Sequence, residues 1–345
     1  MSLTVALVIA ALAVLAAITV HGWWSARRAT PRQATGVVPS EPPSRVEPTL
    51  GPLPALGAAP DAPVPVAASA RRGPRIDALI DAIAALAVEA PVSGDTVLAH
   101  LPPSRRAGSK PMLVEGLNAE SGQWEPPQPG ARYGELQAAV QLANRSGALN
   151  EIEYSEFVQK VHAFADAVGA VPDFPDMLDV VARARELDAF ASPHDATLTV
   201  HLQANSVAWS VGYLHQCAER HGFVPGALPG RMVLPAAEDG APPVLVLSFD
   251  AQAALSDDAQ LAPVRQITLT LDVAQTPEAA EPFAAWQQSI RALAEDMDAA
   301  AVDDQGRPVT LMHYTTIADE LKTLYRALES RDMAAGSAVA RRLFQ

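Results

Sequence analysis

The chain has 345 residues and a formal net charge of −14 at pH 7; 49% of its residues are hydrophobic and only 5% are aromatic. This length predicts one or two globular units. Residues 25–75 carry seven arginines and three acidic residues, so the chain after them has a formal charge of −18. Such an acidic body argues against a nucleic-acid-binding surface, which needs clustered lysine and arginine.

The chain has one cysteine, Cys217, so an intrachain disulfide is excluded. This fits a reducing compartment. We expect Cys217 to be a small buried residue on a helix, with a reactive thiol as the alternative.

The first 24 residues contain no charged side chain, and LTVALVIAALAVLAAITV is almost wholly apolar. About 20 such residues span the ~30 Å hydrocarbon layer of a membrane, so we predict a transmembrane anchor over residues 1–25. Trp23 and Trp24 suit the headgroup interface, and three arginines that follow suit the cytoplasmic side: Arg27, Arg28 and Arg32. The alternative is a cleaved signal peptide, but that needs positive charge before its apolar stretch.

Residues 26–74 form the second predicted segment. Residues 29–74 contain eleven prolines among alanine, valine, serine and glycine. Such a composition favours extended polyproline conformations over a packed core. We therefore predict a disordered linker that holds a cytoplasmic body away from the membrane.

Two helices are predicted from apolar side chains at successive steps of 3, 4, 3 and 4. The first covers residues 151–168, with the apolar positions Tyr154, Phe157, Val161, Phe164 and Val168. The second covers residues 276–297 and repeats the pattern 129 residues later, at Phe283, Trp286, Ile290, Leu293 and Met297. Thr276 is its predicted N-cap, and Pro277 its first helical residue.

The segments around these helices also correspond. ELQAAVQLAN and ITLTLDV precede them as strands with one buried face, and each helix is followed by a turn-rich connection, VPDFPD or VDDQGRPVT, and by another helix. Further upstream the correspondence between the two halves is weaker. It pairs the opening strands RIDALIDAIAAL and DATLTVHL, the first helices SGDTVLAHL and VGYLHQCAERHGF, and the later strands KPMLVEGLN and PPVLVLSFD.

This self-similarity predicts one α+β unit written twice, over residues 75–191 and 192–330, followed by a flexible tail over residues 331–345. In each copy we expect an antiparallel sheet with helices on one face. A single large mixed domain is the alternative.

Chemistry-bearing motifs are missing from the sequence. It has no phosphate-binding glycine loop and no nucleophile elbow, and its eight histidines lack paired metal-ligand spacing. Asp303 and Asp304 precede QGRP and predict a hairpin turn rather than a catalytic pair. We predict no enzyme, no cofactor and no metal site, with an enzyme of scattered residues as the alternative.

The order of parts resembles the ZipA family of membrane-anchored bacterial division proteins, which bind the C-terminal tail of FtsZ. The resemblance rests on an anchor ending in HGWWSARR, the proline-rich linker, and the stretches ERHGFVPGALPG, PVRQITLTLDV and AVDDQGRPVT within residues 195–328. It implies an antiparallel sheet whose open face carries a shallow apolar groove for that tail. Carried over to this sequence, the groove consists of Thr197, Thr199, Leu228, Phe249, Thr268 and Thr270. Strand alternation separately places Leu198, Val200, Leu269 and Leu271 on the opposite face.

The resemblance implies a single-pass protein of the inner membrane at the division septum, with a periplasmic N-terminus and a cytoplasmic body. Two departures from the family stand out. Several groove positions that are bulky and apolar in the family are threonine here, which reduces the apolar area for a peptide and also suits a plain solvated strand face. The copy over residues 75–191 is extra; it is compatible with a peptide site, a contact in a homodimer or a spacer.

Other functions stay open at this point. One is a single-span scaffold with a different division or envelope partner. Another, if the orientation is reversed, is a periplasmic protein of the glycan-binding or energy-coupling type. No nucleic-acid partner is expected.

Overall fold

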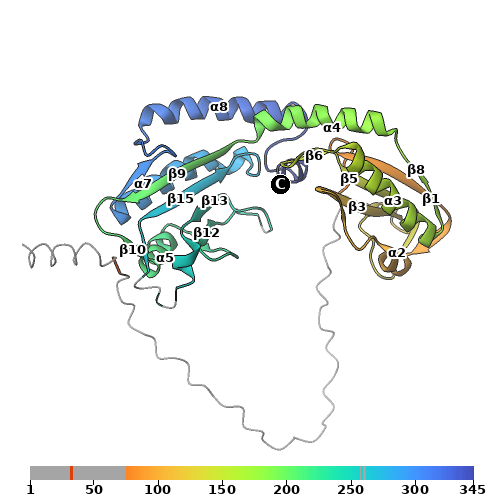
Figure 1. Ribbon diagram of the computed structural model, residues 1–345, viewed down its shortest axis with the longest axis horizontal. Helices are drawn as coiled ribbons and strands as arrows, with labels where there is room; N and C mark the ends of the chain where they lie inside the picture. The colour runs from red at the N-terminus through yellow and green to blue at the C-terminus, as the bar shows by residue number, and fades with distance from the viewer. Residues whose placement is uncertain (1–31, 34–74, 239, 257, 259–261) are drawn as a thin grey trace, which may run out of the picture. The chain divides into compact units, whose positions relative to one another are not determined.

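The computed structural model describes residues 32–33 and 75–345, apart from residues 239, 257 and 259–261 (Figure 1). The chain divides into two compact units between residues 190 and 191, one residue from the boundary expected from the sequence, and Arg32 and Gln33 group with the later one. We call residues 75–190 the first unit and residues 191–345 the second unit. Both combine antiparallel sheets with helices, so the predicted α+β class is confirmed.

The predicted anchor over residues 1–25 and most of the predicted linker lie outside the described residues. Within the described parts of the chain, no helix is both long and apolar enough to cross a membrane.

The first unit contains an antiparallel sheet with the strand order β2-β3-β5-β1-β8, and β4 pairs with the outer side of β3. Its strands are β1 (Asp81–Ser93), β2 (Arg106–Ala107), β3 (Lys110–Asn118), β4 (Trp124–Glu125), β5 (Arg132–Gln141) and β8 (Ala170–Asp173), with a separate hairpin of β6 (Ala143–Asn144) and β7 (Gly147–Ala148). Its helices are α2 (Gly94–His100), α3 (Glu151–Val168) and α4 (Met177–Ala191). Helices α2 and α3 pack on the sheet.

Helix α3 has the predicted bounds, because its capping residues and its stripe of buried apolar residues define the same segment. The side chain of Asn150 accepts hydrogen bonds from the N–H groups of Ile152 and Glu153, and the Glu153 carboxylate accepts one from the backbone N–H of Asn150, which makes a capping box. Gly169 ends the helix in the left-handed conformation, with φ +70°. The predicted apolar stripe is buried along its whole length.

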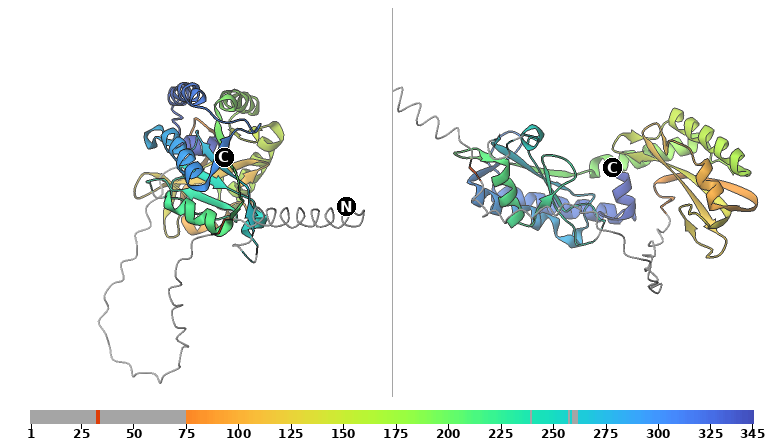
Figure 2. Two further views of the ribbon diagram at one scale, coloured as in Figure 1. Left: turned by 90° about the vertical axis from the view of Figure 1, so that its left-hand side faces the viewer. Right: turned by 90° about the horizontal axis from the view of Figure 1, so that it is seen from below.

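The second unit contains a sheet with the strand order β11-β12-β13-β15-β9-β16, again antiparallel. Its strands are β9 (Thr197–Ala204), β11 (Val224–Pro225), β12 (Arg231–Leu234), β13 (Leu245–Ser248), β15 (Gln266–Asp272) and β16 (Ala299–Val302), and a small sheet joins β10 (Trp209–Ser210) to β14 (Pro263–Val264). Its helices are α5 (Val211–Arg220), α6 (Ala251–Ala254), α7 (Pro282–Met297), α8 (Leu311–Glu329) and α9 (Ala338–Leu343), with 3-10 turns η1 (Ser192–His194) and η2 (Glu278–Ala280). Helix α7 runs along one face of the sheet and contacts α5 (Figures 1 and 2). Cys217 lies buried on α5, as predicted.

The predicted start of the second long helix is wrong. Helix α7 begins at Pro282, because the chain first forms η2 and then takes a left-handed conformation at Glu281, with φ +46°. Thr276 does not cap a helix; it is buried, and its hydroxyl donates to the carbonyl oxygen of Asp272 at 2.9 Å.

The two units share one arrangement of central strands, β3-β5-β1-β8 in the first and β13-β15-β9-β16 in the second. The helices between these strands correspond too: α2 to α5, α3 to α7 and α4 to α8. The sequence predicts a turn-rich connection after each long helix. In the structure an edge strand, β8 or β16, comes first; β8 takes up the first half of VPDFPD, whereas VDDQGRPVT begins at the last residue of β16 and forms a turn. These strands have only four residues each, too few for a visible alternation.

The end of the chain differs from the flexible tail predicted for residues 331–345. Ser337 caps helix α9, and Leu343 and Phe344 are each only 1% exposed. The side-chain amide of Gln275 donates to the carbonyl oxygen of Phe344 at 2.6 Å. This segment belongs to the core of the second unit, so the prediction of a tail is wrong.

Candidate protein-binding face

The strand register of the second unit brings three predicted groove residues onto one side of its sheet. Thr199 lies opposite Thr270, and Thr268 on the same strand lies two positions away on the same side. All three are half-buried. The opposite side carries the residues that alternation predicts for the helix-covered core: Val200, Leu269 and Leu271, each 0% exposed, and the half-buried Leu198.

Apolar residues continue this side of the sheet toward its β11 edge. Val246 lies opposite Thr270, Val233 lies opposite Val246, and Val224 lies opposite Val233. Val224 is 45% exposed, which is high for a large aliphatic side chain. We define the open face as the side formed by Thr197, Thr199, His201, Val224, Val233, Val246, Ser248, Thr268 and Thr270.

Of the other predicted groove residues, Thr197 begins the open face and Leu228 lies outside its strands. Thr197 is exposed and lies opposite Asp272 at the start of β9. Leu228 lies in the loop between β11 and β12 and is 59% exposed. The open face therefore has a threonine-rich half and an aliphatic half.

Phe249 does not belong to the open face, contrary to the expectation from the resemblance. It follows Ser248, whose side is fixed by its pairing with Thr268, so alternation directs Phe249 to the helix-covered side. There its ring lies edge-on to the ring of His215 on α5, with 5.8 Å between the ring centroids.

Two residues at this site were not predicted from the sequence: His201 on the open face and its partner Asp304. One ring nitrogen of His201 lies 3.0 Å from the hydroxyl of Thr268, and the other lies 2.9 Å from a carboxylate oxygen of Asp304. Alternation from Thr199 would have identified His201, but nothing in the sequence connects it to a residue 103 positions away.

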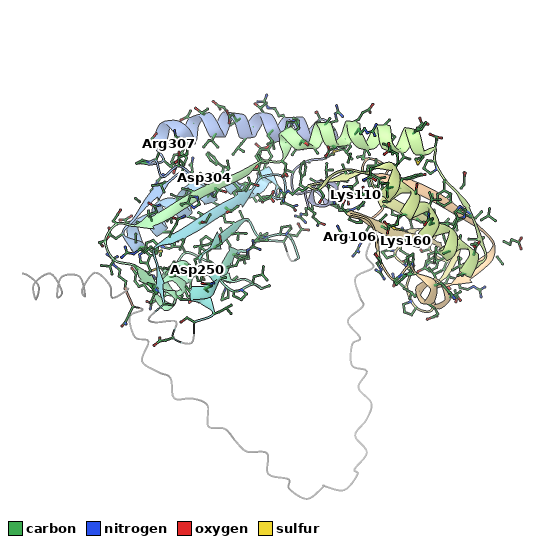
Figure 3. The ribbon with its side chains drawn as sticks, viewed as in Figure 1. Arg106, Lys110, Lys160, Asp250, Asp304 and Arg307 are labelled. Carbon is green, nitrogen blue, oxygen red and sulfur yellow. The ribbon has the colours of Figure 1, made fainter. Side chains whose placement is uncertain are left out.

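The hairpin after β16 positions Asp304, which Figure 3 labels beside Arg307. The carboxylate of Asp303 accepts hydrogen bonds from the N–H groups of Gln305 and Arg307, at 2.9 and 2.8 Å. These bonds, chiefly the one from the Arg307 backbone, lower the pKa of Asp303. The predicted turn at this place is confirmed.

The predicted residues that flank the membrane, Trp23, Trp24, Arg27 and Arg28, lie outside the described residues. Arg32 is described, and it contacts the second unit. Its N–H donates to the carbonyl oxygen of Ala208 at 2.6 Å, and its own carbonyl oxygen accepts from Ser210 at 2.8 Å. Residue 32 thus pairs in parallel with Trp209 of β10.

The side chain of Arg32 adds an ion pair to this contact, with 2.9 Å between its guanidinium and a carboxylate oxygen of Asp298. The same carboxylate accepts from the Asn205 amide at 3.1 Å and from the Ser206 hydroxyl at 2.9 Å. These hydrogen bonds, with the charge of Arg32, lower the pKa of Asp298.

We expect the unfolding temperature of the second unit to fall less steeply with decreasing pH in Asp298→Asn than in the unmodified protein. A carboxyl whose pKa is lowered in the folded state stabilises the protein above about pH 4 and loses this effect as the pH falls through the lowered pKa. Asparagine keeps the shape, tolerates the φ of +52° at this position and does not titrate in this range. The measurement is the unfolding temperature between pH 7 and pH 2.5. Asp319→Asn, at a side chain 73% exposed, is the control and should follow the unmodified protein.

The parts of the chain that the structure describes contain no group of three histidine, cysteine, aspartate or glutamate residues able to hold a metal ion. What they contain is a pair of α+β units, one of which exposes a sheet face with aliphatic and hydroxyl side chains. No protein-family model matches the chain, and no curated protein matches it.

Proposed function

We propose that the chain is a non-catalytic scaffold that binds a partner peptide on the open face of the second unit, in the manner of the ZipA family. The observation that supports this most is the shared face of Thr199, Thr268 and Thr270, adjoining exposed aliphatic residues. Exposed aliphatic groups provide burial for a peptide, and threonine hydroxyls supply hydrogen bonds at its margin.

The partner under this proposal is the C-terminal tail of FtsZ, and the membrane anchor is the apolar segment over residues 1–25. The charge pattern after residue 25 supports a cytoplasmic body, and the part-sequence likeness around β15 supports the partner. Many tethered copies that meet many tails on one filament would bind by avidity, so a weak single contact is sufficient. We further propose that the two units are copies of one ancestral module, because their central strands share one order.

The test is binding of the full-length chain to a fluorescent peptide with the FtsZ tail sequence of the same organism. We expect saturable binding that Leu228→Asp and Thr270→Lys each weaken by about tenfold, since each places a charge in an apolar contact. Thr316→Lys, at an exposed position of α8, is the matched control and should bind as the unmodified chain does.

A lack of saturable binding would contradict FtsZ as the partner and leave a scaffold with another one. Binding that is unchanged in both variants would place the site away from the open face.

A further inference from the structure

The outer edge of strand β3 in the first unit is interrupted. Strand β2 pairs with Lys110 and Pro111, and β4 pairs with Gly116 and Leu117. Between these two pairings, no strand of the described chain covers the outer edge. The uncovered stretch, residues 113–115, is about 10 Å long at ~3.3 Å per residue.

Main-chain hydrogen-bonding groups face this gap. The N–H of Met112 donates outward to the carbonyl oxygen of Arg105 at 2.9 Å, and the register between β3 and β5 runs without a shift from Met112 to Leu117. Because alternate residues of a strand point their N–H and C=O to the same edge, Val114 presents both groups outward. The described residues offer neither group a partner.

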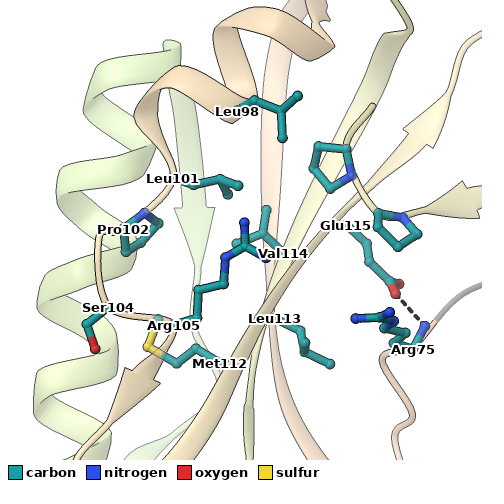
Figure 4. Close-up of a pocket in the computed structure, with 12 residues that line it drawn as sticks. Arg75, Leu98, Leu101, Pro102, Ser104, Arg105, Met112, Leu113, Val114 and Glu115 are labelled. Atoms are coloured by element: carbon teal, nitrogen blue, oxygen red, sulfur yellow. Dashed lines mark hydrogen bonds between the residues drawn. The ribbon is translucent and has the colours of Figure 1, made fainter. Parts of the chain in front are cut away.

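A groove wraps around this edge (Figure 4). It encloses about 580 Å³, open solvent at its mouth included. Its walls are mostly apolar, with Leu98, Leu101, Pro102, Met112 and Val114 among the lining residues, and two prolines that follow β4, Pro126 and Pro127. Prolines cannot pair with a strand through N–H groups, which keeps this edge from closing on itself.

A positive charge points into the groove. Figure 4 shows the side chain of Arg105 directed between Leu101 and Val114. Arg105 is exposed, and its guanidinium has no ion pair or hydrogen bond with the described residues. The one carboxylate among the lining residues, Glu115, is 1% exposed and already accepts from the N–H groups of Arg75 and Ile76 and from the Gln137 amide.

We propose that this groove, the β3-edge groove, binds a short extended peptide that carries an aspartate or glutamate with an apolar residue two positions away on each side, so that all three side chains lie on one face of the added strand. Val114 pairs with the peptide backbone, the apolar side chains enter the groove, and the carboxylate pairs with Arg105. An added strand gains affinity from main-chain bonds and specificity from side-chain pockets. This site lies in the first unit and does not depend on the open face of the second.

The probe is a fluorescent, acetylated and amidated pentapeptide Val-Thr-Asp-Thr-Val, added to the full-length chain. We expect saturable binding, at least about tenfold tighter than that of the Val-Thr-Lys-Thr-Val version, because a charge-assisted hydrogen bond is exchanged for repulsion. Arg105→Glu should weaken the acidic peptide by at least about tenfold and favour the lysine version instead. Arg265→Glu, at an exposed arginine of the second unit, is the control and should change neither affinity.

A second measurement, amide hydrogen exchange, tests whether the main chain of β3 pairs with the peptide. Hydrogen exchange at the Val114 amide should be fast in the free chain and slow with the acidic peptide bound, while Leu113, whose N–H faces β5, should be protected in both states. Equal binding of the two peptides, or an unchanged affinity in Arg105→Glu, would overturn the proposal. So would protection of Val114 before peptide is added, because another segment of this chain would then pair with the edge.

Discussion

Trp209→Ala is expected to destabilise the second unit by about 3–5 kcal/mol. Trp209 is 0% exposed, and its ring N–H donates to the carbonyl oxygen of Met297 at 2.8 Å. Removing the ring leaves a large cavity and takes the shorter of two hydrogen bonds from the Met297 carbonyl oxygen, which keeps only the bond from the Arg32 guanidinium at 3.3 Å. It also removes the core beneath β10, the strand against which Arg32 and β14 both pair.

Urea unfolding followed by circular dichroism measures this effect. Trp124→Ala, at a half-buried tryptophan of the first unit, should cost less and leave the transition of the second unit in place. A loss below about 1 kcal/mol in Trp209→Ala would show that β10 is not a supported part of the core, since full burial predicts several times more.

The second large effect is expected for Gly116→Ala in the first unit. A Cβ at this position would lie 2.4 Å from a ring carbon of Tyr133 and 3.0 Å from its Cβ. Tyr133 cannot move away easily, because it is 0% exposed and its hydroxyl accepts from the Gln128 N–H at 2.8 Å. Overpacking of this kind costs about 1–3 kcal/mol.

Gly134→Ala is the matched control for Gly116→Ala. Gly134 lies on the neighbouring strand β5, and a Cβ there would meet no atom within 4 Å. Unfolding in urea should separate the two variants clearly. If Gly134→Ala is as destabilising as Gly116→Ala, the loss comes from the strand backbone and not from the Tyr133 ring.

Periodic segments with matching end signals were predictable from the sequence. Helix α3 has five apolar positions at helical steps, an Asn-Glu capping box and a C-terminal glycine, so periodicity and both ends agree. The second long helix has the apolar periodicity but no side chain that caps its start. Thr276 was predicted as its N-cap because it precedes a proline. Its hydroxyl donates instead to the carbonyl oxygen of Asp272, four residues earlier at the end of the preceding strand, a local bond that competes with helix capping.

Short elements whose stability comes from distant contacts were not predictable. Leu343 and Phe344 are buried against a loop that includes Gln275, about 70 residues earlier in the chain, and the sequence around them looks like any chain end.

At the open face, alternation sorted the threonines of β9 and β15 correctly, because both strands are long. The prediction for Phe249 was wrong because this residue follows a strand of only four residues. There an alignment shift of one position moves a side chain from the open face to the helix-covered face.

The contact of Arg32 with β10 changes the connectivity expected between membrane and body. If the proposed anchor ends at residue 25, six residues separate it from Arg32, and they reach at most about 22 Å when fully extended. The part of the second unit that contacts Arg32 then lies within this distance of the bilayer, although the second unit comes last in the sequence. Because Arg32 contacts the second unit while residue 75 begins the first, the length of the segment between them does not set the distance from the proposed anchor to the second unit.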